Sequence, residues 1–332
     1  MINHIADTTS AQVGQQLDQL RGTSGVGALG RVLTLIIVAH TEGGVRDALE
    51  AAAGASRAHP SRIIAVLPVA GETARLDAEI RTGSEAGASE IVILRAHAGA
   101  AENVDTLVTP LLLPDTPVVT WWIQNMPENP AATAAGRIAQ RRITTTRTAD
   151  HPALALQHLS ANYVPGDTDL GWAGTTLWRN YIASMVDEFP GRTITGAKVW
   201  GRPHRSSLFL LAAWLRLRLD VPVEIEPQEG APITGVEIFL NDGAALSLHR
   251  TPGNDHGMML RPGRAPQEVS LPVRSLEAML IEDLRDLNPD TAYGEVLTKG
   301  LPLLDYSPAD VDVKAPANAE TVATGSTAAH GA

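Results

Sequence analysis

The sequence predicts an α/β protein with two domains and a C-terminal tail. In the first half of the 332-residue chain, short apolar runs rich in β-branched residues alternate with helical segments, which indicates a layered, mostly parallel sheet covered by helices. In the second half, strand-like runs between Gly, Pro and Asn turns favour an α+β domain. The last residues lack aromatic side chains and are dominated by small residues. We therefore expect an N-terminal domain at 1–162, a C-terminal domain at 163–306 and a disordered tail at 307–332.

The first domain is expected to begin with a helix in which Val13, Leu17 and Leu20 recur at helical spacing. The apolar run RVLTLIIVA that follows is typical of a strand buried on both faces of a sheet. Strands and helices then alternate, which implies parallel strands. The expected strands are 31–39, 61–67, 89–94 and 117–122, with a more exposed one at 76–80, and the expected helices are 7–21, 45–59 and 103–113.

The second domain is expected to start after the turn YVPGD at 163–167. The run Asp167-Thr168-Asp169 is expected to cap a long helix that carries Trp172 and Trp178. An Asp-Gly pair at 242–243 indicates a hairpin in a mainly antiparallel sheet. The expected helices are 169–188, 204–220, 275–286 and 293–297, and the expected strands are 193–200 and several between 221 and 271.

The composition excludes several classes of protein. A net charge of −11 argues against a nucleic-acid binder and against docking to anionic membranes. The absence of cysteine excludes disulfides and thiolate chemistry within the chain. No run of about 18 apolar residues and no signal peptide is present, so we expect a cytoplasmic protein.

Motifs that carry chemistry are missing. The sequence contains no GxSxG, no GxxxxGK[ST] and no HExxH. Its one dinucleotide-like pattern, Gly25-x-Gly27-x-x-Gly30, enters a strand instead of following one, so we interpret it as a connection. The ten histidines are scattered, and His151 and His158 are better explained as a solvated helix face than as metal ligands. We expect no catalytic, cofactor-binding or metal residues.

Four arginines without an acidic neighbour stand between 136 and 147, namely Arg137, Arg141, Arg142 and Arg147. The guanidinium fork suits phosphates or the carboxylates of a partner. The alternative interpretation is a solvated helix face with internal ion pairs, which the residues alone favour.

Tryptophans supply the other candidates for a binding surface. Trp121 and Trp122 end an expected strand, so their side chains should point to opposite faces. One of them can then serve as an interface anchor, although both can equally pack inside. Arg179, next to Trp178, is a further candidate for a contact across the domain boundary.

Seven stretches, in order along about the first 225 residues, resemble the OpcA family of glucose-6-phosphate dehydrogenase assembly proteins of the actinobacterial type. They are GRVLTLIIV (30–38), ASRAHPSRII (55–64), GASEIVIL (87–94), VTPLLLPDTPVVTWW (108–122), GRIAQRRIT (136–144), PGDTDLGWAGTTLWR (165–179) and LFLLAAWLRLRLDVPV (208–223). The resemblance implies a protein that is not an enzyme. It implies binding to glucose-6-phosphate dehydrogenase and promotion of its active oligomer, at the entry to the oxidative pentose phosphate pathway.

The resemblance carries over no catalytic residues, since the family has none agreed. It raises the weight of Trp121, Trp122, Arg137, Arg141, Arg142, Trp178 and Arg179 as partner-binding candidates. The chain departs from the family pattern after the Trp pair, where Ile-Gln follows, and after RRIT, where Thr-Thr-Arg follows. The alternative hypothesis is a sensor or enzyme whose pocket, at the carboxyl ends of the first sheet, holds a sugar phosphate or NADPH.

Overall fold

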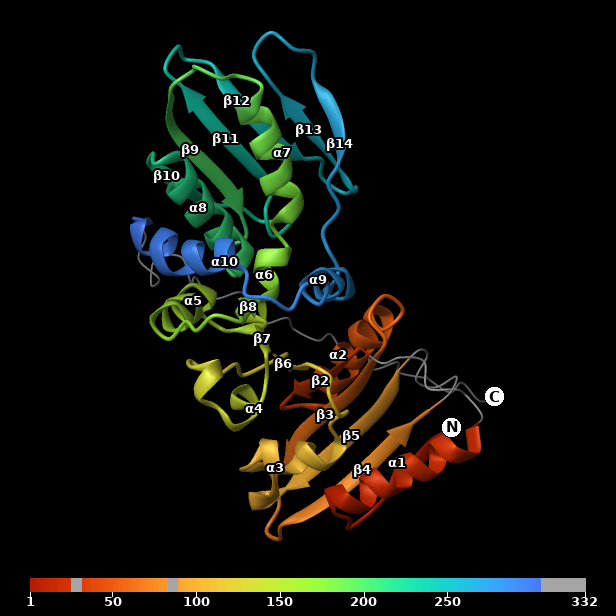
Figure 1. Cartoon of the computed structure of the whole chain (residues 1–332). Coiled ribbons are helices and arrows are strands. Elements are labelled where there is room, and N and C mark those ends of the chain that lie inside the picture. The colour runs from red at the N-terminus through yellow and green to blue at the C-terminus, as the bar shows by residue number, and fades with distance from the viewer. Residues whose placement is uncertain (25–31, 83–88, 306–332) are drawn as a thin grey trace, which may run out of the picture.

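The apolar runs of the first half of the chain lie side by side in an eight-stranded sheet. The structure is a computed structural model that describes residues 1–24, 32–82 and 89–305. Later residues form a second, six-stranded sheet, which lies above the first in Figure 1. The predicted α/β fold, with a mostly parallel, layered first sheet and an α+β second part, is confirmed.

The first sheet is parallel from β5 through β3, β2, β6 and β7 to β8. Counted along the chain this order is that of a doubly wound sheet, 3-2-1-4-5-6. Antiparallel β4 and β1 extend one edge. The bounds are β1 (Ile2–Ile5), β2 (Leu33–Val38), β3 (Ser61–Val69), β4 (Arg75–Arg81), β5 (Glu90–His97), β6 (Val118–Trp122), β7 (Arg141–Thr144) and β8 (Asp167–Asp169).

Helices cover both faces of this sheet, which explains the unbroken apolar run of β2. Leu35 and Ile37 face the core beneath α2 (Glu42–Ala55), whereas Ile36 and Val38 face the core beneath α1 (Ser10–Ser24). Short helices follow β5 and precede β7. They are α3 (Val104–Val108) and α4 (Ala134–Arg137).

The second sheet has the order β10-β9-β11-β12-β13-β14, and only its β9–β10 pair is parallel. Helix α8 (Ser206–Leu219) fills the centre of its core and is buried over most of its length. The strands are β9 (Ile194–Gly201), β10 (Val223–Pro227), β11 (Gly235–Leu240), β12 (Ala245–Arg250), β13 (His256–Leu260) and β14 (Gln267–Ser270). The remaining helices around it are α5 (Pro152–Ala161), α6 (Leu170–Ala173), α7 (Thr176–Asp187) and α10 (Thr291–Glu295).

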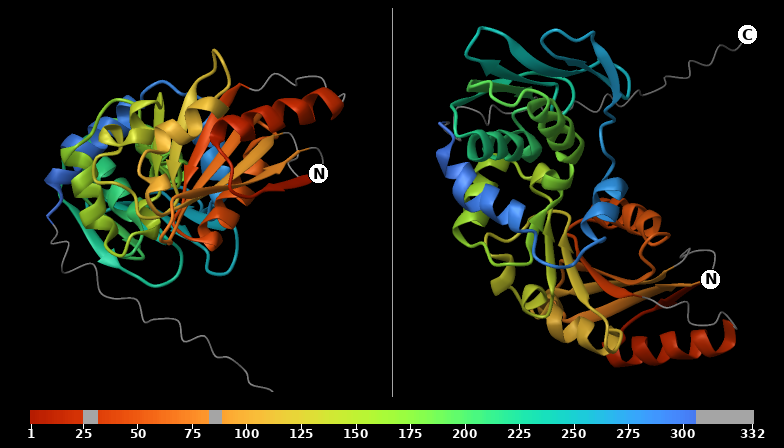
Figure 2. Two further views of the ribbon diagram at one scale, coloured as in Figure 1. Left: turned by 90° about the horizontal axis from the view of Figure 1, so that it is seen from below. Right: turned by 45° about the horizontal axis from the view of Figure 1, so that its top comes forward.

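The chain returns to the first sheet after β14. Helix α9 (Leu276–Asp283) packs beside α2, and its Met279 and Leu280 belong to the core beneath that helix. Figure 2 shows this return as a blue segment beside the orange α2. Two stretches of the predicted second domain, β8 and α9, therefore lie on the first sheet. The division at 162 and 163 stays a prediction.

Several local expectations differ from the structure. The predicted helix 169–188 is split, since β8 ends at Asp169 and α6 and α7 follow. The solvated helix expected around 136–147 is wrong, because RRIT is the buried strand β7. The strand at 76–80 is not exposed, since Leu76, Ala78 and Ile80 belong to the core. The strand β1 was not expected from the sequence.

Two predictions lie outside the described residues, namely the Gly25 to Gly30 pattern and the tail 307–332. Within 1–24, 32–82 and 89–305, no helix has the length and apolar character needed to span a membrane.

Candidate functional site

The three tryptophans expected as anchors are all buried. Trp121 and Trp122 are 0% and 4% exposed and face opposite sides of the first sheet, as the strand geometry predicts. The indole N–H of Trp121 donates to the Thr145 hydroxyl at 2.7 Å. Trp178 is 2% exposed and lies in the second core. Each of these side chains lies in a different apolar core, and none of them reaches the surface.

Arg141 is a buried link between the first sheet and the returning α9. Its Nη2 and Nε lie 2.7 and 3.3 Å from the carboxylate of Asp283, and its Nη1 donates to the Asn288 carbonyl at 2.9 Å. The side chains of Arg141 and Asp283 are each 4% exposed. The Thr168 hydroxyl donates to the same carboxylate at 3.1 Å, so the ion pair is fully hydrogen-bonded.

Arg142 is a second buried link, on the other side of the same strand. Its Nε donates to Asp167, and its two Nη atoms donate to the carbonyls of Ala139 and Pro165. It therefore ties β7 to the start of β8. The sequence places these arginines in one run, but the pleat of β7 sends them to different partners.

The other two candidates lie nearer to water. Arg137 has a side chain that is 59% exposed, 3.7 Å from Asp105. Arg179 stacks on the Trp172 ring at 3.6 Å and donates to the hydroxyls of Thr175 and Thr176. Burial lowers the pKa of Arg179 to about 10. The structure thus disperses Arg137, Arg141, Arg142 and Arg179 instead of gathering them into one site.

The carboxyl ends of β2 and β6 form the switch point at which doubly wound sheets bind ligands. Here the first turn of α2 is capped by Thr41, whose hydroxyl accepts from the Gly44 N–H at 2.9 Å. The Thr41 hydroxyl donates to Gln124 Oε1 at 3.1 Å, and a Cβ on Gly44 would lie only 2.2 Å from that oxygen. A glutamine therefore fills the place that a pyrophosphate would need, and the predicted arginines do not line it.

A pocket of about 430 Å³ lies elsewhere, where segments of both sheets meet. Its walls come from the residues after β7, from α6 and α7, from the loop before α8, from β12 and from the approach to α9. Among its lining residues, all within the described ranges, there is no Asp or Glu. The lining includes Arg147, Arg202, Arg205, Arg250 and Arg274.

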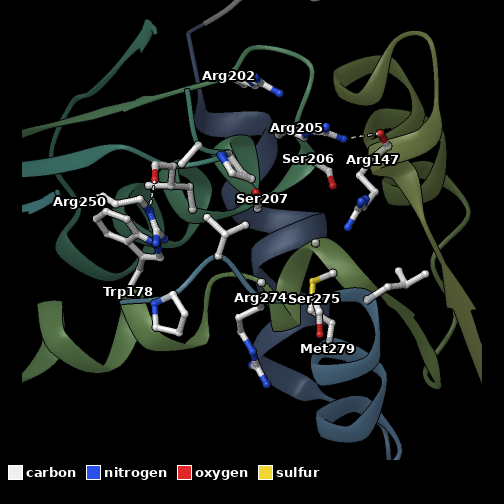
Figure 3. A pocket seen from close by; sticks show the side chains of 18 of the residues that line it. Arg147, Trp178, Arg202, Arg205, Ser206, Ser207, Arg250, Arg274, Ser275 and Met279 are labelled. Atoms are coloured by element: carbon white, nitrogen blue, oxygen red, sulfur yellow. Dashed lines mark hydrogen bonds between the residues drawn. The ribbon is translucent and has the colours of Figure 1, made fainter. Parts of the chain in front are cut away.

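Two of these arginines are satisfied by the protein. Arg274 pairs with Glu282 and donates to the Ala173 and Ala278 carbonyls. Arg250 donates to the carbonyls of Ile233 and Leu271, beside the Trp178 ring. Figure 3 shows Trp178 and Arg250 on one side of the pocket and Arg147, Arg205 and Ser206 on the other.

The other three arginines are crowded and poorly neutralised. Within the described part of the chain, the Arg147 guanidinium has no hydrogen bond and no ion pair. Arg205 donates only to the Arg147 carbonyl, at 3.2 Å, and Arg202 Nε is buried without a hydrogen bond, 3.6 Å from the exposed Glu229. Burial lowers the pKa of Arg147, and burial with the charges of Arg147 and Arg202 lowers the pKa of Arg205. Asp169, the buried anion whose charge acts on Arg147, accepts from the hydroxyls of Thr144 and Ser206 and from the Thr146 and Gly171 N–H groups.

The amino-terminus of α8 opens at the same wall. Its capping residue, Arg205, makes no side-chain cap, and Ser206 and Ser207 line the pocket. The first N–H groups of a helix lack intrahelical partners and carry partial positive charge. The wall therefore combines guanidinium, hydroxyl and amide donors, which suits an anion.

The sequence interpretation missed this pocket. The sequence signal is the loop GRPHR at 201–205, in which Arg202 comes just before the expected helix 204–220 and Arg205 lies in its first turn, followed by two serines. In the sequence, Arg147 is only the last arginine of the group between 136 and 147. Nothing in the local pattern shows that it meets residues 55 or more positions later.

Comparison with known proteins gives the family. No curated protein matches the chain. A 3-ketoreductase from Actinomadura kijaniata, solved with TDP-benzene and NADP, is 10% identical with a TM-score of 0.39, over 82% of this chain and 96% of that one. An NAD binding oxidoreductase from Klebsiella pneumoniae is 10% identical with a TM-score of 0.43, over 83% and 96%. Likenesses this distant carry no conclusion about activity or ligand.

Two family models match consecutive parts of the chain. The model described as the glucose-6-phosphate dehydrogenase subunit N-terminal domain matches residues 52–161. The model described as the C-terminal domain of the same subunit matches residues 165–297. Together they cover well over half of the chain, in the order that the sequence resemblance implied. The chain belongs to the OpcA family of glucose-6-phosphate dehydrogenase assembly proteins.

Proposed function

We propose that this protein is a non-catalytic, cytoplasmic partner of glucose-6-phosphate dehydrogenase that promotes the active oligomer of the enzyme, at the entry to the oxidative pentose phosphate pathway. The observation that carries the proposal is the match of both family models in succession. The filled switch point agrees with it, since Gln124 occupies the region where a doubly wound enzyme would hold its dinucleotide.

Activation of this kind requires a difference in affinity. A partner shifts an equilibrium between inactive and active enzyme only by as much as it binds the active form more tightly. A tenfold shift corresponds to about 1.4 kcal/mol of differential binding. A specific interface of this kind buries about 1,600 Å² in total.

Burial decides which candidates can touch the enzyme directly. Arg137 has an exposed guanidinium on α4, so we assign it a direct contact. We assign Arg141 and Arg142 a supporting role, because their buried ion pairs fix β7. In alanine variants of those two arginines, loss of binding to the enzyme could not be distinguished from loss of folding.

The test is size-exclusion chromatography with light scattering on the protein, on glucose-6-phosphate dehydrogenase from the same organism, and on their mixture. Each peak is assayed for NADP reduction. We expect a co-eluting complex with raised activity, weakened by Arg137→Ala and unaffected by Arg264→Ala, which removes an exposed arginine from the turn between β13 and β14. Separate elution with unchanged enzyme activity would refute the proposal, and a normal complex with Arg137→Ala would refute the contact assigned to Arg137.

A further inference from the structure

The pocket at the junction of the two sheets has a surplus of positive charge that the described residues do not balance. Arg250 and Arg274 are satisfied by protein acceptors, but among the described residues the Arg147 guanidinium has no hydrogen bond and no close ion pair, and only the charge of the buried Asp169 acts on it. Arg202 and Arg205 crowd the same wall, and the Nε of Arg202 has no hydrogen bond, with only the exposed Glu229 at 3.6 Å as its counter-charge. These guanidiniums are half-buried and line the pocket, so an anion bound there would supply the acceptors that the chain does not.

The geometry points to a small phosphate monoester as the ligand of this pocket. A phosphate group carries close to two negative charges at neutral pH and presents three acceptor oxygens. Arg147 and Arg205 offer guanidinium donors, and Ser207 offers a hydroxyl at the uncapped start of α8, whereas the Ser206 hydroxyl donates to Asp169. Helix amino-termini of this kind bind phosphate through their free N–H groups.

The pocket has room for more than an inorganic ion. Its volume of about 430 Å³ lies within the range of small-molecule sites. Ile233, Val273 and Met279 give it an apolar wall, which suits the carbon skeleton of an ester. In Figure 3 Met279 lies below the labelled donors Arg147 and Ser206.

This inference does not rest on the proposed function, because it concerns the free protein. The test is calorimetric titration of the full chain with inorganic phosphate, glucose 6-phosphate and glycerol 3-phosphate, with glucose and glycerol as uncharged counterparts. We expect saturable binding of at least one ester, tighter than that of inorganic phosphate, and none of the uncharged counterparts. The absence of saturable binding of both esters up to the millimolar range would overturn the inference. Inorganic phosphate that binds at least as tightly as both esters would overturn the assignment of the apolar wall.

Variants of the pocket arginines test whether the ester binds in this pocket. Arg147→Gln and Arg205→Gln should each weaken ester binding at least tenfold, whereas Arg264→Gln, a matched loss of one exposed charge outside the pocket, should leave it unchanged. Because their charges are crowded, the ligand-free pocket variants should melt no lower than the wild type. If either variant fails to fold, Arg202→Gln repeats the test. The Arg202 side chain is 42% exposed, so its replacement removes fewer packing contacts. Equal binding by wild type and all pocket variants would show that the ester binds elsewhere.

Discussion

Breaking the buried pair of Arg141 and Asp283 from one side should destabilise the fold strongly. Arg141 lies on β7 and Asp283 ends α9, so the pair joins segments 142 positions apart. Replacement of Arg141 by alanine would leave the Asp283 carboxylate buried with only the Thr168 hydroxyl beside it. Breaking a buried pair from one side costs about 3–5 kcal/mol of unfolding free energy.

An exposed pair on the same helix supplies the control. Arg57 lies 2.8 Å from Glu277 of α9, but the two side chains are 73% and 38% exposed. Surface pairs of this kind contribute about 0–1 kcal/mol. Arg57→Ala and Arg141→Ala thus remove the same type of pair from the same helix, and the difference between them measures the effect of burial.

Calorimetry and urea unfolding measure the difference in stability between the Arg57→Ala and Arg141→Ala variants. With about 2.1 cal/mol/K of unfolding entropy per residue, a loss of about 3–5 kcal/mol lowers the Tm of roughly 300 ordered residues by about 5–8 °C. The double variant Arg141→Met with Asp283→Leu should recover most of that loss, because a buried pair as a unit is close to neutral against an apolar replacement. A Tm for Arg141→Ala within about 2 °C of that for Arg57→Ala would refute the reasoning.

Three further variants test other parts of the structure by thermal and urea unfolding. Gly136→Ala should cost about 1–3 kcal/mol, because its Cβ would lie 1.8 Å from a backbone carbonyl oxygen of the preceding turn; a neutral result would contradict that close approach. Trp121→Phe should cost about 1–3 kcal/mol, because it leaves the buried Thr145 hydroxyl without the indole donor; a loss under about 0.5 kcal/mol would contradict it. A hydrogen bond from Arg95 lowers the pKa of Glu42, so this pair stabilises the fold above the unfolded pKa of 4.5, and the effect disappears as pH falls through the folded value. Arg95→Gln, which also removes the contact of Arg95 with Glu79, should therefore lower the Tm more at pH 7 than at pH 3, and an equal loss at both would exclude ionised carboxylates as the cause.

Local patterns predicted the elements whose surroundings are uniform. The run at 33–38 is apolar throughout because both of its faces are covered, and the structure places it at the centre of the sheet. The helix 204–220 was expected for the same kind of reason, since a strongly apolar run of that length fits a buried helix such as α8. In these segments the residue pattern and the environment carry the same information.

Strand β7 shows where local patterns fail. Two adjacent arginines look like a solvated surface, yet both are buried, because Asp283 and Asp167 neutralise them from segments far along the chain. The split of the helix 169–188 has a similar origin, since Asp169 ends β8 and accepts from Gly171 at the start of α6. Partners of this kind are a property of the tertiary fold and leave no trace in spacing.

The arginines of the pocket differ from the buried arginines in the partners that they have. In the described part of the chain, the buried guanidiniums of Arg62, Arg141 and Arg142 each have a carboxylate within hydrogen-bond reach. The fold therefore gives each of these buried arginines its own carboxylate. The chain, with a net charge of −11, has acidic residues in excess. The arginines at the start of α8 differ, since Arg147 and Arg205 are half-buried and neither has an ion pair among the described residues. An anion bound there would contact Arg147, which follows β7 of the first sheet, and the start of α8, which packs on the second sheet, so its binding free energy would add to the free energy that holds the two parts together.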